Sequence, residues 1–196
     1  MNRLVAAGAL VAFFVAMVVI VITSATGGGG SETTTVTTPT TTRTRTRPTT
    51  TTSRPTSPRV KLSAVGAYDP EGDGHENDDL APLAIDGNPT SFWKTEHYHS
   101  FGKTGVGLIL DAGRIRPLAR VVVSTDETGS AAEIEVGRNP NGPFHLVTSA
   151  RPLEGATTFK LAHGTKGRYV VVWITSLPPS TGEAHVTEVR AFGPKA

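Results

Sequence analysis

An acidic run that begins at Asp69 has the clearest capacity for metal chemistry in this sequence. Asp69, Glu71 and Asp73 follow the order D-x-E-x-D, which is the spacing that opens an EF-hand calcium loop. Gly74 stands at the position of the sharp turn, but Leu80 stands where such a loop needs its bidentate glutamate. Two interpretations follow from the residues: a partial calcium site, or an acidic turn that is simply solvated.

A second oxygen-rich turn lies in the stretch L-A-I-D-G-N-P-T-S-F-W-K-T. Asp86 and Asn88 flank a glycine, and this arrangement favours a tight turn. Phe92 and Trp93 follow and supply a large apolar area. We expect a loop pinned at one end by hydrogen bonds or a cation, and anchored at the other end in a core.

The sequence lacks the common catalytic motifs. It has no serine in a nucleophile elbow, no H-E-x-x-H and no phosphate-binding glycine loop. Cysteine is absent, which excludes disulfides, thiol catalysis and cysteine-bound zinc. Asp126 and Glu127 adjoin each other in a polar turn, where carboxylates are usually solvated. We therefore expect no catalytic residues and no enzymatic activity.

The beginning of the sequence predicts a membrane anchor. Residues 4–22 are apolar and uncharged, and a helix of that length spans about 30 Å, the thickness of a bilayer core. Arg3 precedes the run and the next charge is Glu32, so residues 1–3 are expected in the cytoplasm and the rest outside. The alternative is a cleaved signal peptide, but the apolar run is longer than signal peptides usually have.

Residues 23–58 predict a disordered linker, because a segment rich in Thr and Pro cannot bury enough apolar area to offset its ordering entropy. Such tracts form extended stalks and accept O-linked sugars. Linker arginines supply most of the formal net charge of +2, so the charge does not indicate a nucleic-acid partner. These arginines either contact anionic wall polymers or lipid headgroups, or only keep the stalk soluble.

Residues 59–196 predict an all-β domain, long enough to bury its own core. Short alternating or β-branched runs are separated by turn signals, and no long amphipathic helix is evident. Both tryptophans, Trp93 and Trp173, are expected to be core anchors. We predict a turn at 111–113, one helical turn at 80–85, and strands at 60–68, 106–110, 118–124, 132–137, 144–148, 157–161, 168–175 and 184–192. This pattern is typical of a sandwich or barrel.

The order of five motifs resembles a discoidin (coagulation factor type C) domain. The motifs are L-A-I-D-G-N-P-T-S-F-W, G-L-I-L-D-A-G, L-A-R-V-V-V, R-Y-V-V-V-W-I-T and V-T-E-V-R-A-F-G. The loop Y-D-P-E-G-D-G-H-E-N-D-D-L is similar to the subgroup attached to actinobacterial lipid II flippase-like proteins and membrane serine/threonine kinases. The resemblance implies a galactose-binding-like jelly roll, and a protein that binds carbohydrates, lipid headgroups or proteins.

The resemblance also implies two sites. Similar domains hold a structural calcium between the D-G-N turn and a late glutamate, which corresponds here to Asp86, Asn88, Ser91 and Glu188; the alternative is a turn held by its own hydrogen bonds. Sugar sites in such folds lie on loops at one end, where the residues of suitable type are His97, Tyr98, His99 and Phe101. The two histidines could also bind a transition metal, although such a site needs a third ligand.

These observations predict a single-pass membrane protein whose extracytoplasmic domain binds cell-envelope carbohydrate. The expected partner is a cell-wall glycan, with calcium as a structural cofactor. The alternative is a protein-interaction or regulatory domain of an envelope-assembly complex, which would bind a membrane protein and have no affinity for sugar.

Overall fold

The computed structural model describes residues 56–195, and the chain separates into two units, Met1–Thr50 and Thr51–Ala196. The predicted anchor at 4–22 and nearly all of the predicted linker at 23–58 lie outside the described residues. Among the residues described, no helix is long and apolar enough to cross a membrane. The strands and the core presented below all lie in 56–195, so this segment contains what a domain needs to fold on its own.

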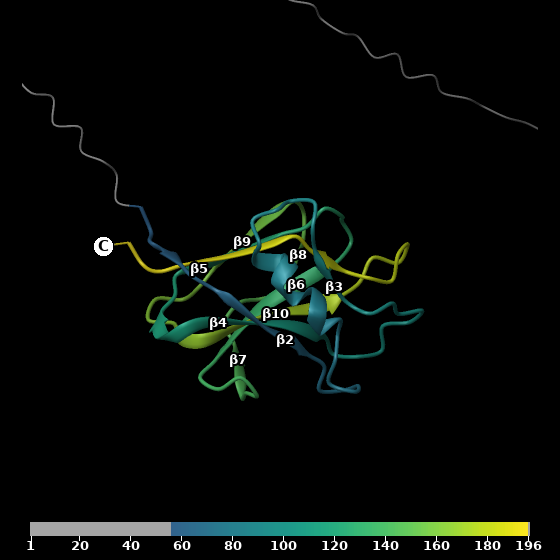
Figure 1. Cartoon of the computed structure of the whole chain (residues 1–196), viewed down its shortest axis with the longest axis horizontal. Coiled ribbons are helices and arrows are strands. Elements are labelled where there is room, and N and C mark those ends of the chain that lie inside the picture. The colour runs from purple at the N-terminus through teal and green to yellow at the C-terminus, as the bar shows by residue number, and fades with distance from the viewer. Residues whose placement is uncertain (1–55, 196) are drawn as a thin grey trace, which may run out of the picture. The chain divides into compact units, whose positions relative to one another are not determined.

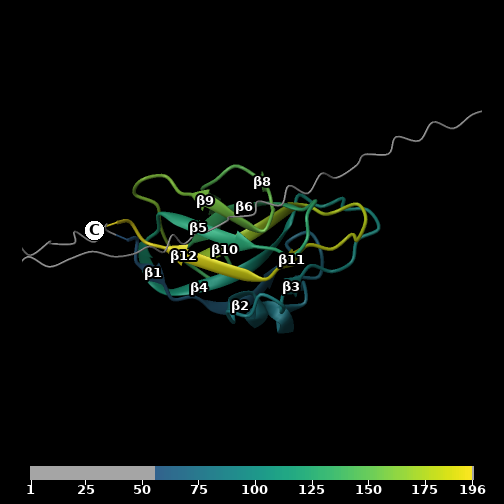
Figure 2. The same cartoon turned by 90° about the horizontal axis from the view of Figure 1, so that it is seen from above.

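Two antiparallel sheets pack face to face, as predicted for a sandwich (Figures 1 and 2). The smaller sheet has the order β1 (Arg59–Val60), β12 (Glu188–Phe192), β5 (Arg120–Ser124) and β9 (Ala156–Lys160). The larger has the order β2 (Ser63–Tyr68), β4 (Val106–Pro117), β10 (Lys166–Ser176) and β6 (Ala131–Gly137), and both β7 (Phe144–Leu146) and β8 (Arg151–Pro152) pair with the edge of β6. A separate ribbon pairs β3 (Trp93–Lys94) with β11 (His185–Val186).

β10 lies in the interior of the larger sheet because it is apolar on both faces. Val172 and Ile174 belong to the main core between the sheets. Val171 and Trp173 belong to a second, smaller cluster. Trp93 is fully buried in the main core, so both tryptophans are core anchors as predicted, each in a different cluster.

A 3-10 helix, η1 (Asp78–Ile85), is the one helix in the described part of the chain. Pro82 lies inside it and has no N–H to contribute, which suits a short helical segment better than a long one. Ala81 and Ala84 are buried and join η1 to the main core. The predicted helical turn at 80–85 is confirmed, and the helix leads directly into the D-G-N turn.

Two predicted strands are divided between sheets. The prediction of one strand at 60–68 is wrong, because β1 pairs with β12 whereas β2 pairs with β4. The predicted strand at 184–192 is likewise divided into β11 and β12. The strand predicted to end at the turn 111–113 continues as β4 to Pro117, and the turn forms inside it as an irregularity, where the Gly113 N–H donates to Asp111 at 2.7 Å. Alternation shows which face a residue takes but not which sheet its strand joins.

Both ends of the described chain lie at one end of the sandwich, and long loops lie at the other (Figures 1 and 2). At the first, which we call the terminal end, the Gly193 N–H donates to the Pro58 carbonyl at 2.9 Å. At the second, the loop end, the Tyr98 N–H donates to the Gly182 carbonyl at 2.9 Å.

Candidate functional site

A buried ionic network holds the loop end together. Glu76 is fully buried, and its carboxylate accepts the Glu96 N–H at 2.6 Å and the hydroxyl of Tyr98. Lys103 Nζ donates to the Tyr98 oxygen at 2.9 Å and to the Asp69 carboxylate at 2.7 Å. The acidic run and the polar aromatic segment, which are separate motifs in the sequence, are therefore cross-linked.

The pKa values in this network follow from burial and from these bonds. Burial raises the pKa of the Glu76 carboxyl, although the bonds from Tyr98 and Glu96 favour the carboxylate. Burial, followed by the bond to Glu76, raises the pKa of the Tyr98 phenol. Burial opposes the charge on Lys103, but the bonds with Asp69 and Tyr98 outweigh it and raise the pKa of the ammonium. Tyr98 and Lys103 thus keep their protons, which suits a structural cross-link and not proton transfer.

The four predicted ligand-binding residues divide into two pairs. Tyr98 and Phe101 pack against the core with ring centroids 5.2 Å apart, and Lys103 Nζ lies 4.9 Å from the centroid of the Tyr98 ring. His97 and His99 are exposed, and their rings contact each other edge to face with the centroids 5.0 Å apart. The structure therefore brings the histidines together at the surface, whereas the other two rings are committed to packing.

The carboxylates of the predicted EF-hand-like loop turn to separate partners. Asp69 belongs to the network above. Glu71 accepts the Thr104 N–H at 3.2 Å and the Thr104 hydroxyl, and Asp73 accepts the His75 N–H at 2.9 Å. Across residues 56–195, no three His, Asp or Glu side chains are grouped so that they could hold a metal ion. This geometry favours an acidic turn whose carboxylates accept hydrogen bonds from protein groups, with Glu71 and the buried Asp69 tied to the segment at Lys103 and Thr104.

The second predicted calcium set does come together, at the turn that follows η1. The Ser91 hydroxyl donates to Asp86 at 2.7 Å, and the Asn88 N–H donates to the other Asp86 oxygen at 2.8 Å. Glu188, at the start of β12, accepts the N–H of the turn glycine at 2.9 Å and Arg59 Nη2 at 3.0 Å. The structure thus places the turn against Glu188, as the resemblance implied, and adds Arg59, which the sequence did not indicate.

Calcium fits these residues only in part. Asp86 and Glu188 offer the hard oxygens that calcium prefers, but each carboxylate oxygen already accepts a hydrogen bond. The bond from Ser91 lowers the pKa of Asp86, so this carboxylate is ionised at neutral pH. Arg59 brings its own positive charge to Glu188, and its side chain is 60% exposed. A cation at this turn would have to displace Arg59 from Glu188.

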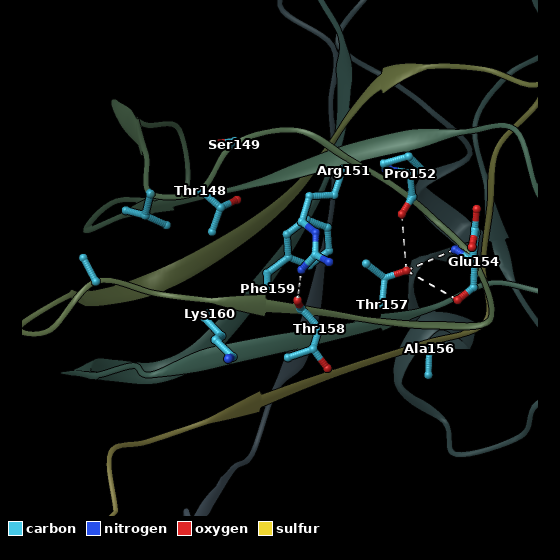
Figure 3. Close-up of a pocket in the computed structure, with 12 residues that line it drawn as sticks. Thr148, Ser149, Arg151, Pro152, Glu154, Ala156, Thr157, Thr158, Phe159 and Lys160 are labelled. Atoms are coloured by element: carbon cyan, nitrogen blue, oxygen red, sulfur yellow. Dashed lines mark hydrogen bonds between the residues drawn. The ribbon is translucent and has the colours of Figure 1, made fainter.

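Sequence reasoning missed a groove along one side of the sandwich, which we call the side groove (Figure 3). It lies between β8, on the edge of the larger sheet, and β9, on the edge of the smaller, and has a volume of about 890 Å³. Its lining side chains provide four hydroxyls, two cations and one carboxylate: Thr148, Ser149, Thr157, Thr158, Arg151, Lys160 and Glu154. In the sequence these residues are a cluster of hydroxyls and charges between two short strands, a pattern that ordinary solvated turns share.

The side groove has a fixed floor and open polar groups. The guanidinium of Arg151 lies 5.9 Å from the ring centroid of buried Phe159 and donates to the Thr158 carbonyl (Figure 3). The hydroxyl of buried Thr157 accepts the Glu154 N–H at 3.0 Å, which ties the turn between β8 and β9. The Glu154 carboxylate and the other N–H groups of Arg151 belong to exposed residues and remain accessible to a ligand.

Comparison with known proteins identifies the architecture. No protein-family model matches the sequence. The chain is similar to the CBM32 carbohydrate-binding module of AlyQ, solved in complex with 4,5-unsaturated mannuronic acid, with 18% identity and a TM-score of 0.52 over 69% of this chain and 96% of that one. It is similar to the family 32 module of NanJ from C. perfringens, solved in complex with galactose, with 19% identity and a TM-score of 0.52 over 70% and 99%.

A third module, CBM32-3 from a family 31 glycoside hydrolase of Clostridium perfringens, gives 18% identity and a TM-score of 0.52 over 68% of this chain and 92% of that one. At such identities the likeness shows the fold alone. The predicted galactose-binding-like jelly roll is thereby confirmed, and the kinship with flippase and kinase domains stays a prediction.

Proposed function

We propose that residues 59–196 form a non-catalytic carbohydrate-binding module whose ligand occupies the side groove. The groove itself carries the proposal: its volume of about 890 Å³ lies in the range of small-ligand sites, and its polar groups stand on the edges of two sheets. Carbohydrate as the ligand class is supported by two modules of the same fold, one solved with galactose and one with an unsaturated sugar acid.

The charged lining favours an acidic sugar. A guanidinium can pair with a carboxylate through two parallel hydrogen bonds, and Arg151 is exposed in the groove. Lys160 adds a second positive charge, while Glu154 can accept hydrogen bonds from sugar hydroxyls. A uronate-containing polysaccharide would use all three residues, whereas a neutral one would leave the cations unpaired.

The proposed setting is the outside of the cell, with the domain carried by the apolar run at 4–22 and the linker at 23–58. A cell-wall glycan would then be within its reach. The calcium site around Asp86 and Glu188 is a further part of the proposal, with a structural role. The competing function, a protein-interaction domain of an envelope complex, draws support from Tyr98, because its ring packs against the core and Lys103 and is not an open face for a sugar.

Retention of residues 56–196 on immobilised acidic and neutral polysaccharides tests the sugar site. Arg151→Ala should lower the affinity for an acidic polysaccharide at least tenfold, because a hydrogen bond to a charged group contributes about 1.5–3 kcal/mol and each 1.4 kcal/mol is tenfold. Arg138→Ala removes an exposed arginine from the turn after β6 and serves as the matched control. It should change the affinity by no more than about twofold.

Three results would overturn the proposal in different ways. Equal losses from Arg151→Ala and Arg138→Ala would show that only net charge matters. A loss caused by His97→Ala with His99→Ala, and none by Arg151→Ala, would move the sugar to the loop end. No retention on any polysaccharide, together with capture by an envelope membrane protein, would favour the protein-interaction domain.

A further inference from the structure

A second groove, at the terminal end, combines an apolar wall with a purely basic rim. It has a volume of about 550 Å³ and runs beside the junctions of β4 with β5 and of β9 with β10. We call it the terminal groove. Every ionisable side chain that lines it is basic: Arg120, Lys160, His163, Lys166 and Lys195. No Asp or Glu lines it, so it presents a concentrated positive field to any ligand.

This basic rim is not a consequence of the domain's overall charge. Residues 56–195 contain fourteen Lys and Arg against sixteen Asp and Glu, so the domain is slightly acidic although no Asp or Glu lines this groove. Arg120 is held in place over the Phe192 ring, with its Cζ 4.0 Å from the centroid. Lys166 and Lys195 are exposed and free to approach a charged surface.

The wall of the terminal groove supplies the apolar part of the surface. Leu118, Leu161 and Pro194 line it, and Leu118 is continuous with the main core. Ile115 lies two residues before the lining residue Pro117 on β4 and is 48% exposed between two arginines. Ile115 is thus an exposed aliphatic side chain flanked by cations, an arrangement suited to a surface with an anionic layer over hydrocarbon.

We infer that the terminal groove is a docking surface for an anionic bilayer, with acidic headgroups on its rim and acyl chains against its wall. Charge complementarity excludes the chain's own preceding segment as the occupant, since residues 1–55 carry five arginines and a single glutamate. A soluble polysaccharide would satisfy the rim but leave the apolar wall without a partner. An anionic lipid satisfies both.

The position of the groove in the chain supports this occupant. Ser57, the second residue of the described chain, lines the groove itself. The apolar run at 4–22 is joined to it by residues 23–55, which reach no more than about 120 Å even when fully extended. If that run lies in a membrane, the chain that leads to the membrane leaves the domain beside the terminal groove.

Co-sedimentation of residues 56–196 with lipid vesicles tests the inference. We expect binding to vesicles that contain phosphatidylglycerol, none to vesicles of phosphatidylcholine alone, and loss of binding at high salt. The double variant Lys166→Gln/Lys195→Gln should weaken binding roughly thirtyfold, since each basic residue at an anionic surface contributes about 1 kcal/mol. Both lysines are exposed, so an unchanged melting temperature verifies that the variant is folded.

The control variant is Lys94→Gln/Arg151→Gln, which removes the same charge from residues outside the terminal groove. It should keep vesicle binding within about threefold, and it separates this surface from the sugar site because Arg151 is the residue tested there. Equal losses in the two double variants, or equal binding to both kinds of vesicle, would overturn the inference. If soluble polygalacturonate competed for the groove as strongly as anionic vesicles do, the occupant would be a polysaccharide and not a lipid. If the protein self-associated and the Lys166→Gln/Lys195→Gln variant abolished that association, the occupant would be a second copy of the chain.

Discussion

Replacing Tyr98 by phenylalanine tests whether the loop end is a structural cap. The change removes one hydroxyl that donates to the buried Glu76 carboxylate and accepts from Lys103 at 2.9 Å. The ring, and its contact with Phe101, can remain where they are. The variant therefore isolates the polar contribution of Tyr98 to the network.

The expected cost follows from what the substitution leaves behind. The Glu76 carboxylate keeps the hydrogen bond from the Glu96 N–H at 2.6 Å but loses the one from the Tyr98 hydroxyl. Lys103 Nζ lies 3.8 Å from the same carboxylate, too far for a hydrogen bond. A lost hydrogen bond to a buried charged group costs about 2 kcal/mol. For a domain of this size, that loss lowers the melting temperature by roughly 6–8 °C.

The pH dependence gives a second signature. The Tyr98 hydroxyl favours the Glu76 carboxylate, so its removal raises a pKa that burial already holds above the ordinary value of 4.5. A folded state with a raised carboxyl pKa binds protons more readily than the unfolded chain, so its stability falls as pH rises through that pKa. The gap in stability between wild type and variant should be widest above the raised pKa of Glu76 and should narrow as the pH falls toward 4.5.

Urea denaturation at several pH values measures both effects, and Tyr68→Phe is the matched control. The ring centroid of Tyr68 lies 5.0 Å from that of Phe144 and 5.6 Å from that of Trp173, and its hydroxyl makes no hydrogen bond with any residue in 56–195. Removing this hydroxyl should lower the free energy of unfolding by less than about 0.5 kcal/mol. The reasoning fails if Tyr98→Phe is no more destabilising than this control, or if its cost is the same at every pH.

Two further predictions concern calcium and packing. Calcium should raise the melting temperature of Arg59→Gln more than that of the wild type, because the variant frees Glu188 from its bond with Arg59. Calcium at 100 times its Kd would raise the free energy of unfolding by about 2.7 kcal/mol. Melting curves that are the same with calcium and with chelator in both proteins would rule out the site. Gly105→Ala should destabilise the domain by about 1–3 kcal/mol and shift tryptophan fluorescence, because the added Cβ would overlap the Trp173 ring and lie 2.7 Å from the Ile174 carbonyl. Gly102→Ala is the control, because the added Cβ would have no neighbour within 4 Å, and it should change neither the stability nor the tryptophan fluorescence.

The sequence predicts those parts of this fold that depend on local pattern. Residues 168–175 are apolar on both faces, and β10 indeed has a sheet neighbour on each side and a cluster on each face. The strand predicted at 60–68 failed because its residues change sheets after Val60, and side-chain alternation contains no information about strand partners.

In the candidate sites, too, local features could be predicted from the sequence, whereas contacts between distant segments could not. The D-G-N turn could be recognised from adjacent residues, whereas the partners of Tyr98 lie elsewhere in the chain and only the fold shows that its ring is packed. The side groove was missed for a related reason. Its residues are close in sequence, but the hollow exists because β8 and β9 belong to the edges of different sheets.

The shortness of β1 has a mechanical consequence. The N-terminal chain enters the domain through a strand that pairs with β12 at only two positions, Arg59 with Phe192 and Val60 with Ala191. A pull on that chain would strain this small pairing before any load reached β4 and β10, which form the longest pairing in the larger sheet. The attachment would therefore yield first, and the Arg59 contact with Glu188 would yield with it, while the side groove kept its shape.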